Sequence, residues 1–507
     1  MSIIENHVNP VQLSMKIKLS FRQVFPLAFF LMIFALAVRQ GAFIDPDLWW
    51  HLQTGQDIVT SRAIPQTDIY SFTKAGSEWV THEWLSEILI YLTFKFTGWA
   101  GLLIVFPGLV SLAFYLVYRR CAAKPYVAAI AVLLAAVASA PLFGIRPQMI
   151  TLLLASIFIT LLTQYASDGR ARRLYWMVPL MLLWVNFHAG YALGLGLIVL
   201  YAISFAVDQK WNLIPRLGLI LLACTAMVPL NPNGFRMFSY PLETLRSPSM
   251  MVFIEEWASP DFHKAMFLPL ALFLFLLLGA LALSPKRARA SEVFLVFVTG
   301  LAALRSARHI PIFALIAAPV FAQQLWEILT ARGWDARFNA PEGSTPRTAV
   351  LFALLLLLAP AALDVALIKH FVSNQPAYEA KNYPQAAVNF LDAEKLPGPI
   401  YNRYGWGGYL IRRLHGEYPV YIDGRADVYG DKFMYEAFNT HDGGNGWFES
   451  LDRFSIRTVL ISPDVPLASL LRSDRQWQKV YEDHQAVIFT RAGAQATFTA
   501  AMPAANQ

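Results

Sequence analysis

Long apolar blocks, each of about 15–22 residues, recur along the chain and constrain its fold more than any other feature. A helix of this length can cross about 30 Å of hydrocarbon. Only 15% of the 507 residues are charged, whereas about 25% is usual in a soluble domain. The blocks lack the two-residue alternation of a membrane β-barrel, so we predict an α-helical polytopic membrane protein.

The apolar blocks place about eleven transmembrane helices in the sequence. We expect them near residues 23–41, 100–118, 126–143, 148–165, 173–187, 190–207, 213–230, 265–283, 291–305, 309–329 and 347–368. The stretch 84–97 is shorter and contains Glu87 and Lys95, so we expect it to lie along the membrane surface. Lys16 and Lys18 precede the first block, which favours a retained signal anchor at the N-terminus.

Basic residues in the short loops predict the orientation of the helices. The basic loops are 118–124, 168–173, 208–216, 284–290 and 331–339. If 84–97 does not cross, these loops lie on the same side as the basic N-terminus, which the positive-inside rule assigns to the cytoplasm. The loop 42–99, the loop 231–264 and the residues after 369 are then extracytoplasmic. The same rule explains the net charge of +7 without a nucleic acid as partner.

The end of the chain differs in character from the rest. Strand-like segments such as GPIYN, YPVYID, TVLIS and AVIFTR alternate there with helical segments such as PLASLLRS. We therefore predict a transmembrane domain over 1–369, with the extracytoplasmic loop 42–99, and a soluble extracytoplasmic α/β domain over 370–507.

The predicted topology gathers an unusual set of polar residues at the outer face. The set comprises Asp45, Asp47, His51, His82, Glu83, Arg146, Asn186, His188, Arg305, Arg308 and His309. Arginine at an outer membrane boundary is costly unless it has a partner. Because the guanidinium fork matches phosphate oxygens, basic groups near two aspartates suggest an anionic, lipid-linked phosphate as the ligand.

Several motifs carry a resemblance to a known family. They are DPDLWWH (45–51), WVNFHAG (184–190), NPNG (231–234), EEWASP (255–260), YGWGGYLI (404–411) and YIDGRADVYG (421–430). In this order they resemble the polytopic glycosyltransferases of the C superfamily, which include protein O-mannosyltransferases and lipid A aminoarabinose transferases. The resemblance covers most of the chain. It implies a fold of the glycosyltransferase C type in a bacterial inner (plasma) membrane.

The resemblance also implies a reaction. A sugar would move from a polyprenyl-phosphate donor to an extracytoplasmic glycan, lipid or protein, with inversion at the anomeric carbon. A carboxylate of the first outer loop would act as general base, and cationic groups would stabilise the departing phosphate. We favour Asp47 as the base, with Asp45 as its rival. The competing interpretation is that both aspartates are helix caps or surface charges.

The remaining residues of the set are assigned to the substrate and its phosphate. They are His51, His82, Glu83, Arg146, Asn186, His188, Arg305, Arg308 and His309. The competing interpretation of Arg305 and Arg308 is an ion pair with Glu255 or Glu256, or binding of lipid headgroups. Arg146 has similar alternatives, and Asn186 and His188 could be ordinary polar residues at helix ends.

Metal binding is the main alternative for the histidines. His51, His82 and Glu83 have suitable ligand atoms, but no compact ligand motif supports a divalent metal, so we expect no cofactor. Trp49 and Trp50 are expected to be anchors at the membrane interface. In the segment YIDGRADVYG, Asp423, Arg425 and Asp427 follow a predicted strand, where ligand sites of α/β domains often lie; we favour a structural ion pair over such a site.

Two other classes of function remain open from the sequence. A transporter or flippase of a lipid-linked saccharide would also gather charges, but near the middle of the membrane on broken helices. A non-catalytic envelope assembly protein would use its C-terminal domain to recruit partners. A variant of Asp47 that folds and keeps full function would favour the assembly protein.

Overall fold

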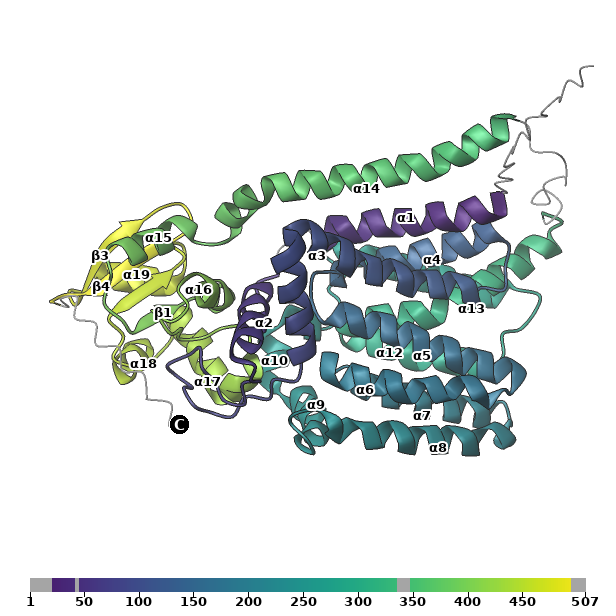
Figure 1. The fold of residues 1–507 in the computed structure, drawn as a ribbon, viewed down its shortest axis with the longest axis horizontal. Helices are drawn as coiled ribbons and strands as arrows, with labels where there is room; N and C mark the ends of the chain where they lie inside the picture. Colours follow the sequence, from purple (N-terminus) through teal and green to yellow (C-terminus); the bar gives the residue numbers. More distant parts are fainter. Residues whose placement is uncertain (1–20, 42–44, 335–346, 494–507) are drawn as a thin grey trace, which may run out of the picture.

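The computed structural model describes residues 21–41, 45–334 and 347–493, and it shows a helical bundle with an α/β region at one end (Figure 1). The long helices of the bundle are α1 (Phe21–Gly41), α3 (Trp84–Arg120), α4 (Pro125–Ser139), α5 (Gln148–Asp168), α6 (Met177–Phe187), α7 (Tyr191–Val207), α8 (Ile214–Met227), α11 (Leu268–Leu283), α12 (Ala290–Arg305), α13 (Ile310–Ala331) and α14 (Arg347–Asn382). Every apolar block identified in the sequence falls on one of these helices. The prediction of a polytopic helical protein is therefore confirmed.

The number of helices that cross the membrane is a finer question. Among the described residues, 8 helices are long and apolar enough to do so. The other three, α6, α7 and α12, have 11, 17 and 16 residues. The count of about eleven spans stays a prediction. The N-terminal residues Lys16 and Lys18 lie outside the described residues, as does most of the basic loop 331–339.

Helix α3 contains a break that the sequence analysis anticipated. Gly98 leaves the helical conformation, with φ of 62° and ψ of −155°, in a region that glycine adopts without the steric cost of a Cβ atom. The break separates the arm 84–97 from the long apolar helix that follows. This arm packs beside α2 (Leu48–Ser61) across the end of the bundle (Figure 1).

The segments predicted to be extracytoplasmic gather at one end of the bundle (Figure 1). They include α2, α9 (Arg236–Arg246), α10 (Pro248–Phe253) and the whole α/β region. These segments contact one another directly. Arg236 forms an ion pair with Glu78, and the Val420 N–H donates a hydrogen bond to the Tyr70 carbonyl. Residues that are far apart in the sequence can therefore share one site at this end.

The α/β region is built on a four-stranded sheet. Its elements are α15 (Gln385–Ala393), β1 (Ile400–Asn402), α16 (Gly407–Arg413), α17 (Ala426–His441), α18 (Trp447–Arg453), β2 (Thr458–Ile461), α19 (Pro466–Ser473), β3 (Trp477–Glu482) and β4 (Val487–Arg491). The strand order is β1-β2-β4-β3, with β1 and β2 parallel and the other pairs antiparallel. Three of the expected strands are present. YPVYID is not a strand of this sheet, because Val420 pairs with the loop residue Ser71 instead.

The first loop and the α/β region share one apolar core. Trp49 and Trp50 are buried, with 5% and 7% of their surface exposed, and the ring of Trp49 lies 5.1 Å from that of Tyr409 in α16. The expectation that both tryptophans are interfacial anchors is wrong. The reason is that Gly408, which has no side chain, lets α16 approach α2 closely. The proposed domain boundary at 369/370 also falls inside α14.

Candidate functional site

Two aspartates stand at the start of α2, at the end of the bundle that faces the α/β region. Asp45 Oδ1 accepts a hydrogen bond from the Asp47 backbone N–H at 2.8 Å, which shapes the turn before the helix. Asp47 occupies the N-cap position, yet its side chain makes no capping hydrogen bond. Its Oδ1 instead accepts a hydrogen bond from Trp50 Nε1 at 3.1 Å. The Asp47 carboxylate is therefore held by the indole and is not used as a helix cap.

A chain of alternating charges links Asp45 to distant parts of the sequence. Arg146, which lies just before α5, forms an ion pair with Asp45. Its Nη1 lies 2.7 Å from Glu256 Oε2, which makes a second ion pair. Glu256 also accepts from Arg308 at 2.8 Å, and the Arg308 guanidinium lies 4.5 Å from the centre of the Trp257 ring. The ion-pair interpretation of Arg308 and Arg146 is thus what the structure shows, with Glu256 as the shared partner.

The other members of the RSARHIP turn lie differently. Arg305, the last residue of α12, is exposed, and its main-chain carbonyl accepts a hydrogen bond from Ser259. His309 is half-buried, and its Nδ1 is buried without a hydrogen-bond partner among the described residues. The structure therefore brings Arg308 into the charge chain and leaves Arg305 at the surface.

The environment of Asp47 changes its acidity. Burial and the negative charge of Asp45 raise the pKa of Asp47 from 3.8 to about 7, and the opposing effects of His51 and Arg146 are smaller. The residue as a whole is nevertheless partly exposed. A carboxyl group with this pKa can accept a proton efficiently near neutral pH, which is the property of a general base.

Three histidines surround the carboxylate of Glu83. His82 Nε2 and His188 Nε2 lie 3.1 Å and 3.3 Å from Glu83 Oε1, and His51 Nε2 lies 3.6 Å from Oε2. Burial would raise the pKa of Glu83, but the charge and hydrogen bond of His82 hold it well below its usual value. Glu83 is therefore ionised and binds these imidazoles together.

Hydrogen-bond partners assign different charges to two of these rings. His82 faces an acceptor at each nitrogen, the Val80 carbonyl and Glu83, so both nitrogens donate; burial lowers its pKa but Glu83 outweighs this and the pKa is raised. His188 Nδ1 accepts from the Gly190 N–H at 2.9 Å, and burial lowers its pKa to about 4. These hydrogen bonds favour the cationic form of His82 and the neutral form of His188.

The candidate residues around Glu83 do not have the arrangement of a metal site. Within the described residues, no group of three or more His, Cys, Asp and Glu side chains could hold a metal ion. His51 also lies 3.7 Å from Glu87, so its ring faces two carboxylates, and these raise its pKa against the opposing effect of burial. The cluster is best described as a buried network of ion pairs.

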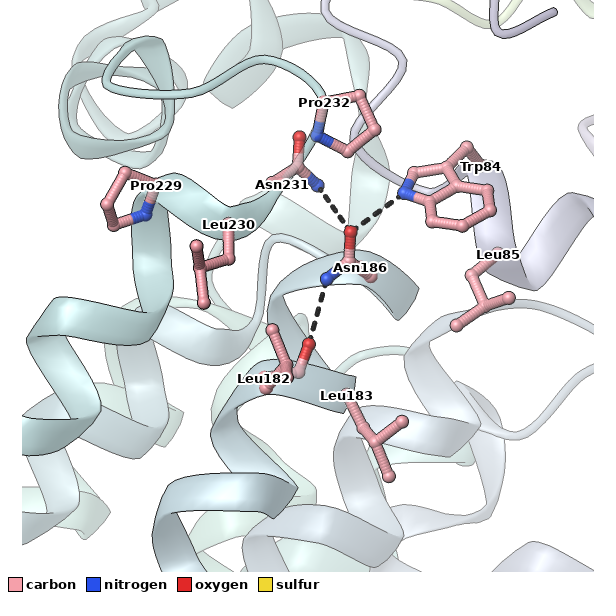
Figure 2. A pocket seen from close by; sticks show the side chains of 9 residues that line it. All are labelled: Trp84, Leu85, Leu182, Leu183, Asn186, Pro229, Leu230, Asn231 and Pro232. Carbon is pink, nitrogen blue, oxygen red and sulfur yellow. Dashed lines mark hydrogen bonds between the residues drawn. The ribbon is translucent and has the colours of Figure 1, made fainter.

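Asn186 joins three elements at the edge of an apolar cavity (Figure 2). Its Oδ1 accepts hydrogen bonds from Trp84 Nε1 at 2.9 Å and from Asn231 at 3.5 Å, and its amide donates to the Leu182 carbonyl. The cavity measures about 500 Å³ and is lined by Trp84, Leu85, Leu182, Leu183, Asn186, Pro229, Leu230, Asn231 and Pro232. Asn186 is thus satisfied by the protein, and its immediate role is to connect α3, α6 and the segment after α8.

Solved structures of two membrane enzymes share this architecture. The oligosaccharyltransferase of Archaeoglobus fulgidus matches 93% of this chain and 75% of its own, at 13% identity and a TM-score of 0.51. ArnT from Cupriavidus metallidurans, in the apo state, matches 92% of this chain and 97% of its own, at 17% identity and a TM-score of 0.51. Both are membrane glycosyltransferases of the C superfamily. The chain has the glycosyltransferase C fold.

The same oligosaccharyltransferase tethered to an acceptor peptide that contains an NVT sequon matches with a TM-score of 0.52 and 13% identity. No protein-family model matches the sequence, and a search of curated proteins finds no match either. The similarity to known proteins therefore lies in the fold. At that level the structural comparisons confirm the resemblance to the glycosyltransferases of the C superfamily.

On this fold, the α/β region reaches the candidate base, which the sequence analysis did not foresee. Gly424 lies against the Asp47 carboxylate so closely that a Cβ atom at this position would overlap it. Asp427 accepts a hydrogen bond from Tyr240 in α9 at 3.1 Å, and the Tyr240 ring lies 4.5 Å from that of His82. The motif YIDGRADVYG, which contains Gly424, marked this segment as unusual in the sequence. It gave no information that Asp47 would be the residue it contacts.

The expected ion pair in this motif is present and extends further than predicted. Arg425 pairs with Asp423 at 2.6 Å and with Asp68 of the first loop at 2.8 Å. Its guanidinium also lies 4.6 Å and 5.0 Å from the ring centres of Trp79 and Tyr70. Because Arg425 touches both the loop and the α/β region, it fastens Gly424 in place beside Asp47. We call Arg425, Asp68 and Asp423 the Arg425 clamp.

The contact between Gly424 and Asp47 leads to a first prediction. Gly424→Ala is expected to displace the Asp47 carboxylate or the α/β region, lowering stability by about 1–3 kcal/mol through overpacking. Thermal unfolding of the purified protein measures this effect. Gly405→Ala is the matched control, because a Cβ atom there meets nothing within 4 Å. Equal melting temperatures for the two variants would contradict the contact.

Proposed function

We propose that this protein is a membrane glycosyltransferase that moves a sugar from a polyprenyl-phosphate donor to an acceptor on the extracytoplasmic side. The observation that carries the proposal is the carboxyl group of Asp47, a partly exposed residue with a pKa of about 7, beside a chain of arginines on the glycosyltransferase C fold. The proposal includes an inner-membrane location with a cytoplasmic N-terminus. It also includes an extracytoplasmic position for the α/β region that follows α14.

In the proposed reaction, Asp47 removes a proton from a hydroxyl or amine of the acceptor. The acceptor atom forms a bond to the anomeric carbon while the bond from that carbon to the phosphate oxygen breaks. The electron pair of the broken bond leaves with the polyprenyl phosphate, and the configuration at the anomeric carbon inverts. Asp45 is less suited to this role, because Arg146 and the Asp47 N–H already engage its two oxygens.

The arginines have capacity for the phosphate despite their ion pairs. The Nε atoms of Arg146 and Arg308 are buried and have no hydrogen-bond partner among the described residues. A phosphate oxygen can satisfy such N–H groups, and cations aimed at the leaving group stabilise the charge that grows on it in the transition state. The cationic ring of His82 would add to this field.

The apolar cavity beside Asn186 offers room for the lipid part of the donor. Its leucines Leu183 and Leu230 have 47% and 57% of their surface exposed, and they belong to helices of the membrane bundle. An isoprenoid chain is an apolar ligand that such a surface accommodates. Trp84, which lines the cavity, follows Glu83 directly in the sequence, so lipid and phosphate could bind next to each other.

Two neighbouring arginines provide a sharp test of the phosphate role. The protein, in lipid nanodiscs, is incubated with a panel of polyprenyl-phosphate sugars and an envelope extract as acceptor source, and release of polyprenyl phosphate is followed. Arg308→Gln is expected to lower the release by at least about tenfold, since a hydrogen bond to a charged group contributes about 1.5–3 kcal/mol. Arg305→Gln, three residues away and exposed, is expected to leave it unchanged.

The outcome separates the proposed enzyme from the other classes. Release that is lost in both arginine variants, or in neither, contradicts the assigned role of Arg308. A protein that moves the donor between leaflets without consuming it would be a flippase. The position of the charges argues against that class, because Asp45, Arg146 and Arg308 lie between helices, at their ends, and not near the middle of a span, where transporters bind their substrates.

A further inference from the structure

Helix α9 carries three distinct stripes of side chains on its surface. Met237 and Tyr240 are buried against the protein. Arg236, Ser239 and Glu243 form a second stripe, in which Arg236 bonds to both of the others. The third stripe consists of Phe235, just before the helix, followed by Phe238, Leu242 and Leu245. Their spacing of three and four residues places these four side chains on one face of the helix.

The third stripe is strongly exposed for apolar side chains. Phe235 has 79% of its surface exposed, Phe238 41%, Leu242 52% and Leu245 46%. A contiguous exposed patch of large apolar residues in a protein usually marks a surface that something else covers. We call these four residues the α9 stripe.

The position of the α9 stripe indicates what covers it. Only a short segment separates α9 from α8, whose apolar span Trp211–Leu230 is one of the membrane candidates. The outward side chains of that span are exposed too, with Leu219 at 51%, Leu222 at 70% and Leu230 at 57%. Helix α9 therefore follows an apolar span with exposed leucines, and it lies beside the end of α8, where the bundle ends (Figure 1).

We propose that α9 is an interfacial membrane helix whose α9 stripe inserts into the lipid bilayer at the extracytoplasmic surface. The charged stripe beside it, which ends at the exposed Arg246, faces the headgroups and water. This division into apolar and charged faces is the pattern of helices that lie in the plane of a membrane. The proposal does not depend on the protein being a glycosyltransferase.

Membrane contact at α9 would also act on the candidate site. The buried stripe of the same helix carries Tyr240, which donates a hydrogen bond to Asp427 and packs on the ring of His82. A helix anchored in the bilayer holds these groups at a constant height above it. The bilayer therefore positions Tyr240, and through it the contact between the α/β region and His82.

Spin labels can test the position of each face of α9. Cys121 and Cys224 are the two cysteines of the chain, so Cys121→Ser and Cys224→Ala give a background for single labels. Labels are placed at Phe238→Cys and Leu242→Cys in the α9 stripe, and at Glu243→Cys and Arg246→Cys in the charged stripe. Accessibility to oxygen, which enters lipid, and to a water-soluble nickel chelate is measured for the full chain in lipid nanodiscs.

The expected result is a helical pattern in the accessibilities. The ratio of oxygen to nickel accessibility should be higher at positions 238 and 242 than at 243 and 246, with a period of about 3.6 residues. Equal ratios at all four positions would show that water covers the stripe and would overturn the proposal. Protection of 238 and 242 from both reagents would show that protein covers it, with the same consequence. A size-exclusion elution volume equal to that of the wild-type protein verifies that each variant is folded.

Discussion

Replacement of Asp47 by asparagine is expected to reduce sugar transfer by about 10²–10⁴-fold, the usual contribution of a positioned general base. Asparagine keeps an oxygen that can accept the hydrogen bond of Trp50 Nε1, so the side chain should remain in place. Transfer is measured as release of polyprenyl phosphate from the donor that the wild-type protein consumes. A variant that folds normally and retains full activity would contradict the assignment of Asp47.

The pH dependence provides a second readout for the same residue. Because the pKa of Asp47 is about 7, activity of the wild-type protein should rise with pH and level off above this value, as the base loses its proton. Residual activity of the Asp47→Asn variant should lack this step. If another group were the base, the variant would keep the pH step of the wild type, and the two profiles would have the same shape.

The stability of the variant should change in the opposite direction to its activity. A carboxyl group with a raised pKa binds its proton more tightly in the folded than in the unfolded protein, so stability falls as pH rises from about 4 to 7. Asparagine removes this loss. Above pH 7 we expect Asp47→Asn to gain about 1–2 kcal/mol, a value reduced to allow for the partial exposure of Asp47.

Asp45→Asn is the matched control for this effect. It removes the carboxylate that pairs with Arg146 and accepts from the Asp47 N–H, and it is therefore expected to lower the melting temperature. A stabilised Asp45→Asn variant together with a destabilised Asp47→Asn variant would reverse the roles given to the two aspartates. Differential scanning fluorimetry across the pH range from 4 to 8 measures both.

Removal of Arg425 is expected to have the largest effect on stability. Arg425→Ala would leave Asp68 and Asp423 as buried carboxylates without their partner, and loss of one member of a buried ion pair costs about 3–5 kcal/mol. The side chains of the Arg425 clamp are at most 1% exposed, so water cannot replace the lost contacts. We expect the α/β region to separate from the first loop, which limited proteolysis of the full chain can detect.

Arg472→Ala is a suitable control for the Arg425 clamp. Arg472 also pairs with a carboxylate, Glu482, but the two side chains are 34% and 30% exposed. Exposed ion pairs contribute about 0–1 kcal/mol, so this variant should melt close to the wild type. If Arg425→Ala were no less stable than Arg472→Ala, the clamp would not hold the two parts together.

Sequence reasoning was most successful where the signal is local. The apolar blocks identified the helices of the bundle, because the length and hydropathy of a spanning segment depend on consecutive residues. The short arm 84–97 was recognised for the same reason, since Glu87 and Lys95 interrupt its apolar character. The order of the motifs identified the fold family, which the structural comparisons support.

The residues of the site were predicted only in part from the sequence, because contacts between residues far apart in the chain decide which of them come together. Arg305 and Arg308 belong to one motif, yet only Arg308 reaches Glu256. Trp49 and Trp50 have the composition of interfacial anchors and are buried instead, because α16 covers them. No local pattern distinguishes these outcomes.

By itself, the sequence determined that this protein is a helical membrane protein, because the hydrocarbon thickness sets the length and polarity of each crossing segment. Tertiary structure alone decided that Gly424 lies against Asp47 and that Arg425 joins Asp68 to Asp423. Asp47 and Asp68 are more than 350 positions away from Asp423, Gly424 and Arg425 in the sequence, and the acidity of a carboxyl group depends on the burial and the neighbours that folding gives it. The chemistry of the candidate base is thus a property of the folded chain.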